Sequence, residues 1–457
     1  MSEKKDTNKM HKMRGVFNSP WEKSFEKILT PFEVFVHRQT TSGLLLMATA
    51  LLALALANSS LAGLYHHWVQ APIGISFNNW SLEKTLHHWV NDGLMALFFF
   101  VVGLELKREI LVGELAVPRQ AALPIVAAIG GMLVPALIYY SINPSGDAAR
   151  GWGIPMATDI AFAIGALVLL ADRVPKPLIT FLVALAIVDD LGAVLVIAIF
   201  YTDNLSYEAV IAASILLSLL ITLNRAGIRQ PMPYFVLGVL LWFALLKSGV
   251  HATLAGVLTA FTIPAHPKYD PARFSELVKK LMARFDASLK SDKNIMTNED
   301  LSTLVATLEN GVDKVGTPLQ RLEHRLHIPV AFLVIPIFAL INAGIPIEFS
   351  TLGETLSHPV TLGVMLGLTA GKFIGIAGAS WLALKIGIGQ LPAKTHFSQI
   401  AGVALLAGIG FTMSIFIADL GFSDQAEYLL MAKTGILIAS LVAGIGGYIW
   451  LWKASKQ

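Results

Sequence analysis

The stretch Leu178–Phe200, LITFLVALAIVDDLGAVLVIAIF, decides the fold of this chain. It is 23 residues long and apolar except for Thr180, Asp189 and Asp190. About 20 apolar residues in an α-helix cross the roughly 30 Å hydrocarbon layer of a bilayer, so the stretch predicts a membrane-spanning helix with the acidic pair near its middle. Each Asp at that depth costs about 2.5–3.5 kcal/mol on insertion scales, so the fold must supply a cavity, a counter-charge or a bound cation there.

The composition of the whole chain agrees with this interpretation. Of its 457 residues, 55% are hydrophobic and only 14% are charged, whereas a soluble domain carries about 25% charged residues. Membrane lipid is therefore an expected partner, and the net charge of +3 is too small to indicate a nucleic-acid partner. The chain has no Cys, which excludes disulfides, thiolate metal sites and a Cys nucleophile.

Hydrophobic runs recur along the chain and predict an all-α polytopic membrane protein with twelve transmembrane helices. The runs are 43–59, 88–105, 120–142, 152–171, 178–200, 206–224, 232–247, 250–264, 328–346, 361–384, 398–418 and 427–452. The first run ends in Ala55-Leu56-Ala57, which resembles a signal-peptidase site, but about 40 residues precede it, so we expect it to remain in the protein.

The loops alternate between rich in Lys and Arg and nearly free of them. Lys107, Arg108 and Arg119 follow the second run, for example, while 201–205 has no basic residue. Since cytoplasmic loops are rich in Lys and Arg, both termini are expected in the cytoplasm. The predicted organisation is a cytoplasmic tail, a twelve-span domain and a long cytoplasmic loop within that domain, at 1–42, 43–453 and 265–327.

Two loops are more than simple connections. Residues 60–87 contain alternating apolar residues around Asn78-Asn79, which predicts a hairpin that either pairs with a second copy or caps the helices. Within 265–327, apolar residues at helical spacing predict an amphipathic helical flap. These apolar residues are Phe274, Leu277, Leu281, Phe285 and Leu289, and then Leu301, Leu304 and Leu308.

Two further ionisable residues lie deep inside runs, at about the depth of the acidic pair. Asp159 follows Thr158 in 152–171, and Lys372 lies in 361–384. Adjacent residues point about 100° apart on a helix, so one of the paired Asp residues can neutralise Lys372 while the other faces a water-filled side. A single Asp–Lys pair can be purely structural, but four such groups at one level favour transport of a small hard cation or of protons.

Glycine and proline interrupt two of the runs. Gly153 and Pro155 precede Thr158, and Gly408 and Gly410 lie in 398–418. Broken helices at corresponding places in two halves indicate inverted three-helix repeats, here spans 3–5 and 10–12 with spans 4 and 11 discontinuous. Asp159 would then compensate positive helix ends and Lys372 negative ones.

Further ionisable residues lie at the membrane edges. Glu105 and Glu109, one helical turn apart, end the second run and either attract cations or form a solvated helix end. His251 begins a later run, and Glu323, His324 and His327 begin another, where a change of local pH would alter their charge.

Several motifs together resemble those of bacterial NhaA-type sodium/proton antiporters, from about Pro31 to Lys453. The matching runs are Ala157-Thr158-Asp159-Ile160-Ala161-Phe162, Ala186-Ile187-Val188-Asp189-Asp190-Leu191-Gly192, Gly103-Leu104-Glu105-Leu106-Lys107-Arg108-Glu109, Lys247-Ser248-Gly249-Val250-His251-Ala252-Thr253, Arg321-Leu322-Glu323-His324 and Gly408-Ile409-Gly410-Phe411-Thr412-Met413-Ser414. The chain departs from the family pattern in a longer 265–320 segment and in an extra acid, Asp419.

The resemblance implies an electrogenic, pH-regulated Na⁺(Li⁺)/H⁺ antiporter of the bacterial inner membrane that works by alternating access. It implies no enzyme activity and no cofactor apart from the transported ions, with a homodimer formed through the hairpin at 60–87. By the same resemblance, Asp189 and Asp190 bind Na⁺, and Lys372 pairs with Asp189. Thr158 and Asp159 lie at the helix crossing within the ion-binding site. The residues implied to respond to pH are Glu105, Glu109, His251, Glu323 and His324.

Two other functions fit parts of the pattern. A sodium-coupled solute symporter can share such a fold, but it needs a polar substrate cavity that the sequence does not indicate. An intramembrane aspartyl protease also uses two Asp residues on separate helices, but its Gly-x-Gly-Asp motif is missing and a Lys in the site would interfere.

Overall fold

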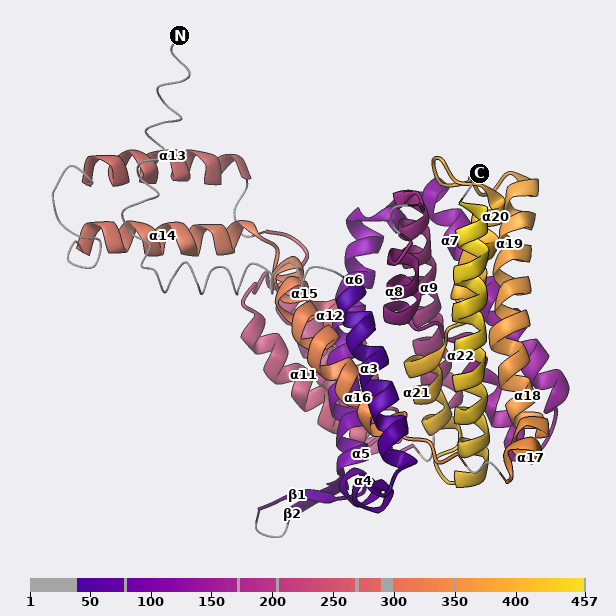
Figure 1. The fold of residues 1–457 in the computed structure, drawn as a ribbon. Coiled ribbons are helices and arrows are strands. Elements are labelled where there is room, and N and C mark those ends of the chain that lie inside the picture. The colour runs from indigo at the N-terminus through magenta and orange to yellow at the C-terminus, as the bar shows by residue number, and fades with distance from the viewer. Residues whose placement is uncertain are drawn as a thin grey trace, which may run out of the picture.

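The protein is a bundle of helices with one small β-hairpin (Figure 1). The structure, a computed structural model, describes residues 39–77, 80–170, 173–202, 205–267, 271–288, 299–347 and 350–455. The predicted tail 1–42 lies almost entirely outside the described residues.

The helices of the first half run from the first hydrophobic stretch to the long insertion. They are α3 (Gln39–Ala57), α4 (Ala62–Val69), α5 (Leu86–His88), α6 (Met95–Val112), α7 (Pro118–Ile142), α8 (Ile160–Val168), α9 (Lys176–Phe200), α10 (Tyr207–Arg225), α11 (Pro231–Leu246) and α12 (Leu254–Thr262). A π-helical turn, Trp89–Leu94, precedes α6, and short 3₁₀ helices occupy Glu114–Ala116 and Asp147–Met156.

The helices of the second half begin within the long insertion. They are α13 (Pro271–Ser288), α14 (Glu299–Val315), α15 (Pro318–Pro329), α16 (Ile335–Asn342), α17 (Leu352–Ser357), α18 (Pro359–Leu366), α19 (Lys372–Ile386), α20 (Phe397–Leu406), α21 (Phe411–Gly421) and α22 (Ala426–Ala454). Two more π-helical turns, Val330–Val334 and Gly367–Gly371, join α15 to α16 and α18 to α19.

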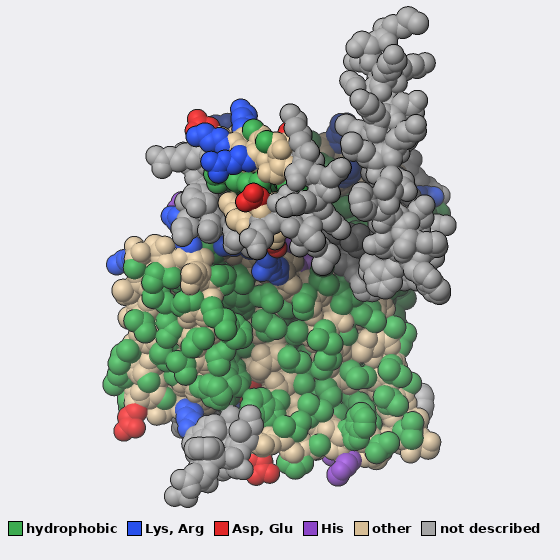
Figure 2. Space-filling model, turned by 90° about the vertical axis from the view of Figure 1, so that its left-hand side faces the viewer, with side chains coloured by type: hydrophobic (Ala, Val, Ile, Leu, Met, Phe, Trp, Pro, Cys, Tyr) green, Lys and Arg blue, Asp and Glu red, His purple; other side chains and the backbone are tan. Residues whose placement is uncertain are grey.

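Length and hydropathy identify the helices that can cross a membrane. Among the described residues, seven helical segments are long and apolar enough, or nine when each of two bent pairs is counted as one span. A broad belt of hydrophobic side chains covers the face shown in Figure 2, with Lys and Arg side chains gathered above it. The chain is therefore a multi-pass helical membrane protein, and the number of twelve spans stays a prediction.

The two ends of the bundle carry different additions. At the end of the bundle where α22 finishes, α13 and α14 lie side by side and project to one side, away from the bundle (Figure 1). We call this the insertion end. The two helices confirm the helical periodicity predicted within 265–327, and Leu281 and Leu301 are buried, whereas Leu289 lies outside the described residues. The next helix, α15, begins at Pro318, ten residues before the ninth hydrophobic run, after a cap in which Thr317 accepts a hydrogen bond from the Gln320 N–H.

The opposite end carries the β-hairpin predicted within 60–87, and we call it the hairpin end (Figure 1). Strands β1 (Pro72–Phe77) and β2 (Trp80–Thr85) pair antiparallel, with Phe77 opposite Trp80 and Pro72 opposite Thr85. The helix α6 runs between the two ends, so residues along it mark depth in the bundle.

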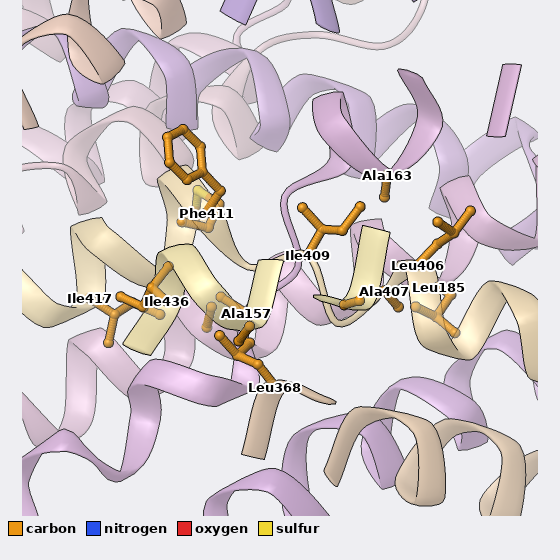
Figure 3. Close-up of a cluster of buried hydrophobic side chains, with 14 of the residues drawn as sticks. Ala157, Ala163, Leu185, Leu368, Leu406, Ala407, Ile409, Phe411, Ile417 and Ile436 are labelled. Atoms are coloured by element: carbon orange, nitrogen blue, oxygen red, sulfur yellow. The ribbon is translucent and has the colours of Figure 1, made fainter. Parts of the chain in front are cut away.

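Both predicted helix interruptions are present. The 3₁₀ helix Asp147–Met156 gives way to extended backbone at Ala157–Asp159 before α8 begins. The axes of α20 and α21 are bent by 48° across a short break. Side chains from the two breaks, including Ala157, Ala407 and Ile409, gather in one buried hydrophobic cluster (Figure 3). The fold thus brings the two interruptions together in the core of the bundle.

Candidate ion-binding site

The acidic pair lies on the middle of the long helix α9. The side chains of Asp189 and Asp190 are buried, with residue exposures of 0% and 1%. An isolated ionised carboxylate in such surroundings is costly, so each needs a proton, a cation or a counter-charge. The two residues meet this need differently.

Asp189 has a counter-charge. The Nζ atom of Lys372, also fully buried, forms an ion pair with its Oδ2 atom, as the family resemblance implied. The hydroxyl of Thr158 lies 2.6 Å from the same oxygen and 2.9 Å from the carbonyl oxygen of Ala407, and it donates its single proton to one of them at a time. The Oδ1 atom of Asp189 has no hydrogen-bond partner among the described residues.

Glycines allow the helix of Lys372 to approach its neighbour. A Cβ atom at Gly130 of α7 would lie 2.4 Å from the carbonyl oxygen of Gly375 on α19, and a Cβ at Gly375 would lie 2.2 Å from the carbonyl oxygen of Gly130. Small residues permit such close packing of membrane helices. This contact, one turn from Lys372, holds α19 at the depth where its ammonium reaches α9.

Asp159 lies where the two broken helices meet. It caps the N-terminus of α8 by accepting a hydrogen bond from the Phe162 N–H at 3.1 Å. Its other oxygen accepts from the N–H and the hydroxyl of Thr412 in the first turn of α21. One carboxylate thus compensates the positive ends of two helices, as predicted.

Carbonyl groups at the opposite helix ends are bonded to hydroxyl and amide groups. The hydroxyl of Ser414 donates to the carbonyl oxygen of Ile154 at 2.9 Å, and the Asp159 N–H donates to that of Ile409 at 2.7 Å. The structure therefore pairs Lys372 with Asp189 and leaves compensation of these carbonyls to Ser414, Thr158 and the backbone.

Asp190 differs from the other two acids because neither of its carboxylate oxygens has a hydrogen-bond partner among the described residues. It lines a cavity of about 110 Å³ together with Asp159 and Thr412. The cavity also reaches Glu105 and His327, whose side chains are 23% and 50% exposed at the insertion end. A cavity of this size holds several water molecules, so a small cation with part of its hydration shell fits beside Asp190.

A set of ion pairs lies where this cavity approaches the insertion end. His327 Nδ1 lies 3.2 Å from Glu105 Oε1. Arg108 bridges two other carboxylates, with its guanidinium nitrogens 2.9 Å from Glu109 and 2.9 Å from Glu323. These groups join α6 to α15 beside the mouth of the cavity.

Three of the five residues predicted to respond to pH are thus brought together, and two are not. His324 is exposed to solvent, and the neighbouring turn of α15 supplies His327 instead. His251 interacts electrostatically with Asp92, which precedes α6 at the hairpin end. His251 therefore lies apart from Glu105.

Two polar residues of this region, Thr412 and Arg108, were not predicted from the sequence to take part in the site. A hydroxyl beside paired glycines at a helix break was the available signal for Thr412. His327, which the sequence already placed with Glu323 at the membrane edge, lies one helical turn after it, on the face that turns towards α6.

Buried charges at the meeting point of two interrupted helices, in a multi-pass membrane bundle, define an ion-coupled membrane transporter. Comparison with known proteins identifies the family of transporters to which the chain belongs. The family model described as Na⁺/H⁺ antiporter 1 matches residues 33–451, and the chain belongs to this family.

Several proteins are similar in sequence to this chain over nearly its whole length. The Na(+)/H(+) antiporter NhaA 1 of Saccharophagus degradans is 61% identical, over 96% of this chain and 94% of the relative. The Na(+)/H(+) antiporter NhaA of Sulfurimonas denitrificans is 54% identical, over 96% of this chain and 99% of the relative. That of Syntrophobacter fumaroxidans is 53% identical, over 94% and 92% respectively. The resemblance stated from the sequence motifs is confirmed.

Proposed function

We propose that the chain exchanges Na⁺ or Li⁺ for protons across a bacterial inner membrane by alternating access. The names of its relatives support sodium/proton antiport. The observation that carries the proposal for the site is Asp190: a buried carboxylate, both of whose oxygens lack partners, in the wall of a cavity that reaches the insertion end.

The exchange follows from competition for carboxylate oxygens. Carboxylate oxygens are ligands that small hard cations prefer, and the same atoms bind protons. The two oxygens of Asp190 and the Oδ1 atom of Asp189 lack other partners, so they are the groups available to Na⁺. If the site opens to one side at a time, proton entry from one side drives sodium exit to the other without any covalent chemistry.

The Asp189–Lys372 pair supplies the second exchangeable charge that electrogenic transport needs. A cation bound between the adjacent carboxylates competes with the Lys372 ammonium for Asp189. Release of a proton from Lys372 together with one from Asp190 would couple two protons to each Na⁺. Thr158 and Asp159 hold the broken helices in place around these groups.

The setting of the exchanger follows from the same reasoning. We place the insertion end in the cytoplasm, with both termini, because the basic loops alternate accordingly. The ion-pair set of Glu105, Glu109, Arg108, Glu323 and His327 then lies at the cytoplasmic mouth, where its protonation would regulate access. The hairpin lies on the periplasmic side, where it would join two copies into a homodimer.

The size of the cavity argues against coupled uptake of an organic solute. Sites for small organic molecules are typically about 300–1,000 Å³, whereas the cavity beside Asp190 measures about 110 Å³. A cation and a few water molecules fit this space, and a metabolite does not.

The direct test uses everted membrane vesicles that carry a respiration-generated proton gradient. Addition of Na⁺ or Li⁺ should collapse the gradient with the native chain, whereas K⁺ should not. Asp190→Asn should abolish the response, while Asp424→Asn, a change at an exposed acid, should leave it intact. Undiminished sodium-dependent collapse with Asp190→Asn would refute the assignment of the site.

A further inference from the structure

The buried acid Asp419 lies outside the proposed ion-binding site. Asp419, in the last turn of α21, is 8% exposed. A carboxylate at the C-terminal end of a helix faces the negative end of the helix dipole, so this position is unfavourable for α21 alone. Its contacts must therefore come from other elements.

Four polar groups from four elements surround Asp419. Its Oδ1 atom forms an ion pair with Lys433 of α22 at 2.8 Å, and its Oδ2 atom accepts a hydrogen bond from the amide of Asn91 at 3.2 Å. His87 of α5 lies 3.7 Å from Oδ2. Asn342 of α16 donates to the Asn91 side chain at 2.8 Å. We call these five residues the polar seam.

An aromatic layer separates the polar seam from the ion-binding site. Phe416, one turn before Asp419 on α21, lies between Phe99 of α6 and Phe338 of α16, with ring centroids 5.5 and 6.2 Å away. All three rings are 1% exposed. Since Thr412 lies one further turn back, a single face of α21 presents the ion-binding site, the aromatic layer and the polar seam in succession.

The same two groups of helices flank the cavity and form the seam. On one side lie α8 and α21, with Asp159 and Thr412 facing the cavity. On the other side lie α6, α15, α16 and the π-helical turns that begin or join them, with Glu105 and His327 at the open end. The cavity between them reaches Glu105 and His327 at the insertion end, whereas the aromatic layer and the polar seam join the two groups at the hairpin end. For the site to open at the hairpin end, the aromatic layer and the polar seam must separate.

We propose that Asp419 is a positioning residue that closes the ion-binding site towards the hairpin side, through Lys433 and the Asn91–Asn342 pair. The inference rests on the alternating access proposed above, but it concerns a different set of residues. Lys433 on α22 neutralises the carboxylate. Asn91, which precedes α6, donates a hydrogen bond to it and accepts one from Asn342 of α16. Breaking the seam should shift the population towards a state open at the hairpin end.

Accessibility of a single thiol measures this shift. The chain has no Cys, so Val102→Cys in the cavity wall gives the only thiol. A membrane-impermeant maleimide is added to right-side-out vesicles or to everted ones, without any Na⁺ or proton gradient. Asp419→Asn should raise the labelling rate from the hairpin side about tenfold, as expected for loss of a charge-assisted hydrogen bond, and lower it from the insertion side.

Three further variants separate this effect from misfolding. The double variant Asp419→Asn/Lys433→Gln leaves no buried unpaired charge and should show the same shift. Asp419→Glu retains the charge and should remain close to the parent. Asp424→Asn, five residues further along and exposed, is the matched control and should not change either rate.

Unchanged labelling from both sides in Asp419→Asn and in the double variant would overturn the proposal. Because labelling requires no transport, this outcome is independent of the vesicle assay of Asp190→Asn. A variant that does not exchange sodium for protons can still show the shift in labelling rates, and a variant that transports normally can fail to show it.

Discussion

Replacement of Lys372 by Met should strongly destabilise the protein. The ammonium of Lys372 and the carboxylate of Asp189 are both 0% exposed, and removal of the ammonium leaves that carboxylate with the Thr158 hydroxyl as its remaining donor. Leaving one partner of a buried ion pair uncompensated costs about 3–5 kcal/mol. Met has nearly the length of Lys and fills the same space, so packing changes contribute little.

The double variant Asp189→Asn/Lys372→Met separates the cost of an unpaired charge from the cost of a lost contact. Replacing both members of a buried pair by uncharged groups is often nearly neutral, because desolvation offsets their attraction. We therefore expect the double variant to be more stable than Lys372→Met, with a coupling energy of about 3 kcal/mol. Its transport should nevertheless be impaired, because Asp189 contributes oxygen ligands to the proposed ion-binding site.

Unfolding of the purified protein in detergent, monitored for the parent, both single variants and the double variant, completes the cycle. The expected order of stability places Lys372→Met lowest and the double variant near the parent. A double variant as unstable as Lys372→Met, or a single variant as stable as the parent, would show that the two charges are not coupled in the folded protein.

Three other predictions address the packing, the hydrogen bonds and the ion competition. Gly130→Ala should lower the stability by about 1–3 kcal/mol, because its Cβ would lie 2.4 Å from the carbonyl oxygen of Gly375. Gly378→Ala, where the Cβ meets nothing within 4 Å, should be tolerated. Thermal unfolding of both variants distinguishes them. Thr158→Val should lower the stability by about 1–3 kcal/mol, since it removes the hydroxyl 2.6 Å from Asp189 while keeping a branched side chain; stability equal to that of the parent would contradict this. The apparent Na⁺ affinity should rise by up to about tenfold per pH unit for each proton displaced, because protons and Na⁺ compete for the same oxygens. Sodium titrations of gradient collapse at several pH values test this, and a half-saturating concentration independent of pH would refute it.

Much of the arrangement of buried charges could be predicted because charged residues in a hydrophobic run are conspicuous. Asp159, Asp189, Asp190 and Lys372 each interrupt an apolar stretch, and their similar depths already suggested a common site. Helical geometry also predicted that the adjacent carboxylates have different partners. The structure gives Asp189 an ion pair and Asp190 a cavity.

The remaining contacts depend on how helices cross, which hydropathy does not report. Thr412 looks like any hydroxyl in an apolar run until α21 meets Asp159. The polar residues Glu323, His324 and His327 were placed at the membrane edge, but the sequence did not indicate that Glu323 and His327 lie on α15 and pair with α6. A helix can begin with charged side chains when another helix supplies their partners, and the periodicity of one segment does not reveal such a partner.

The three carboxylates of the proposed ion-binding site differ in how many donors hold them, and this difference assigns their parts in the exchange. Asp159 accepts hydrogen bonds from Phe162 and from two groups of Thr412, all of which stabilise a charged carboxylate at two positive helix ends. Asp189 is held at one oxygen only, and Asp190 at neither. A carboxylate with many fixed donors gains little from a cation, whereas one without donors depends on a proton or a cation to remain buried. Asp190 should therefore exchange its ligand first, Asp189 should follow as Lys372 is displaced, and Asp159 should keep its charge and maintain the crossing of the two broken helices.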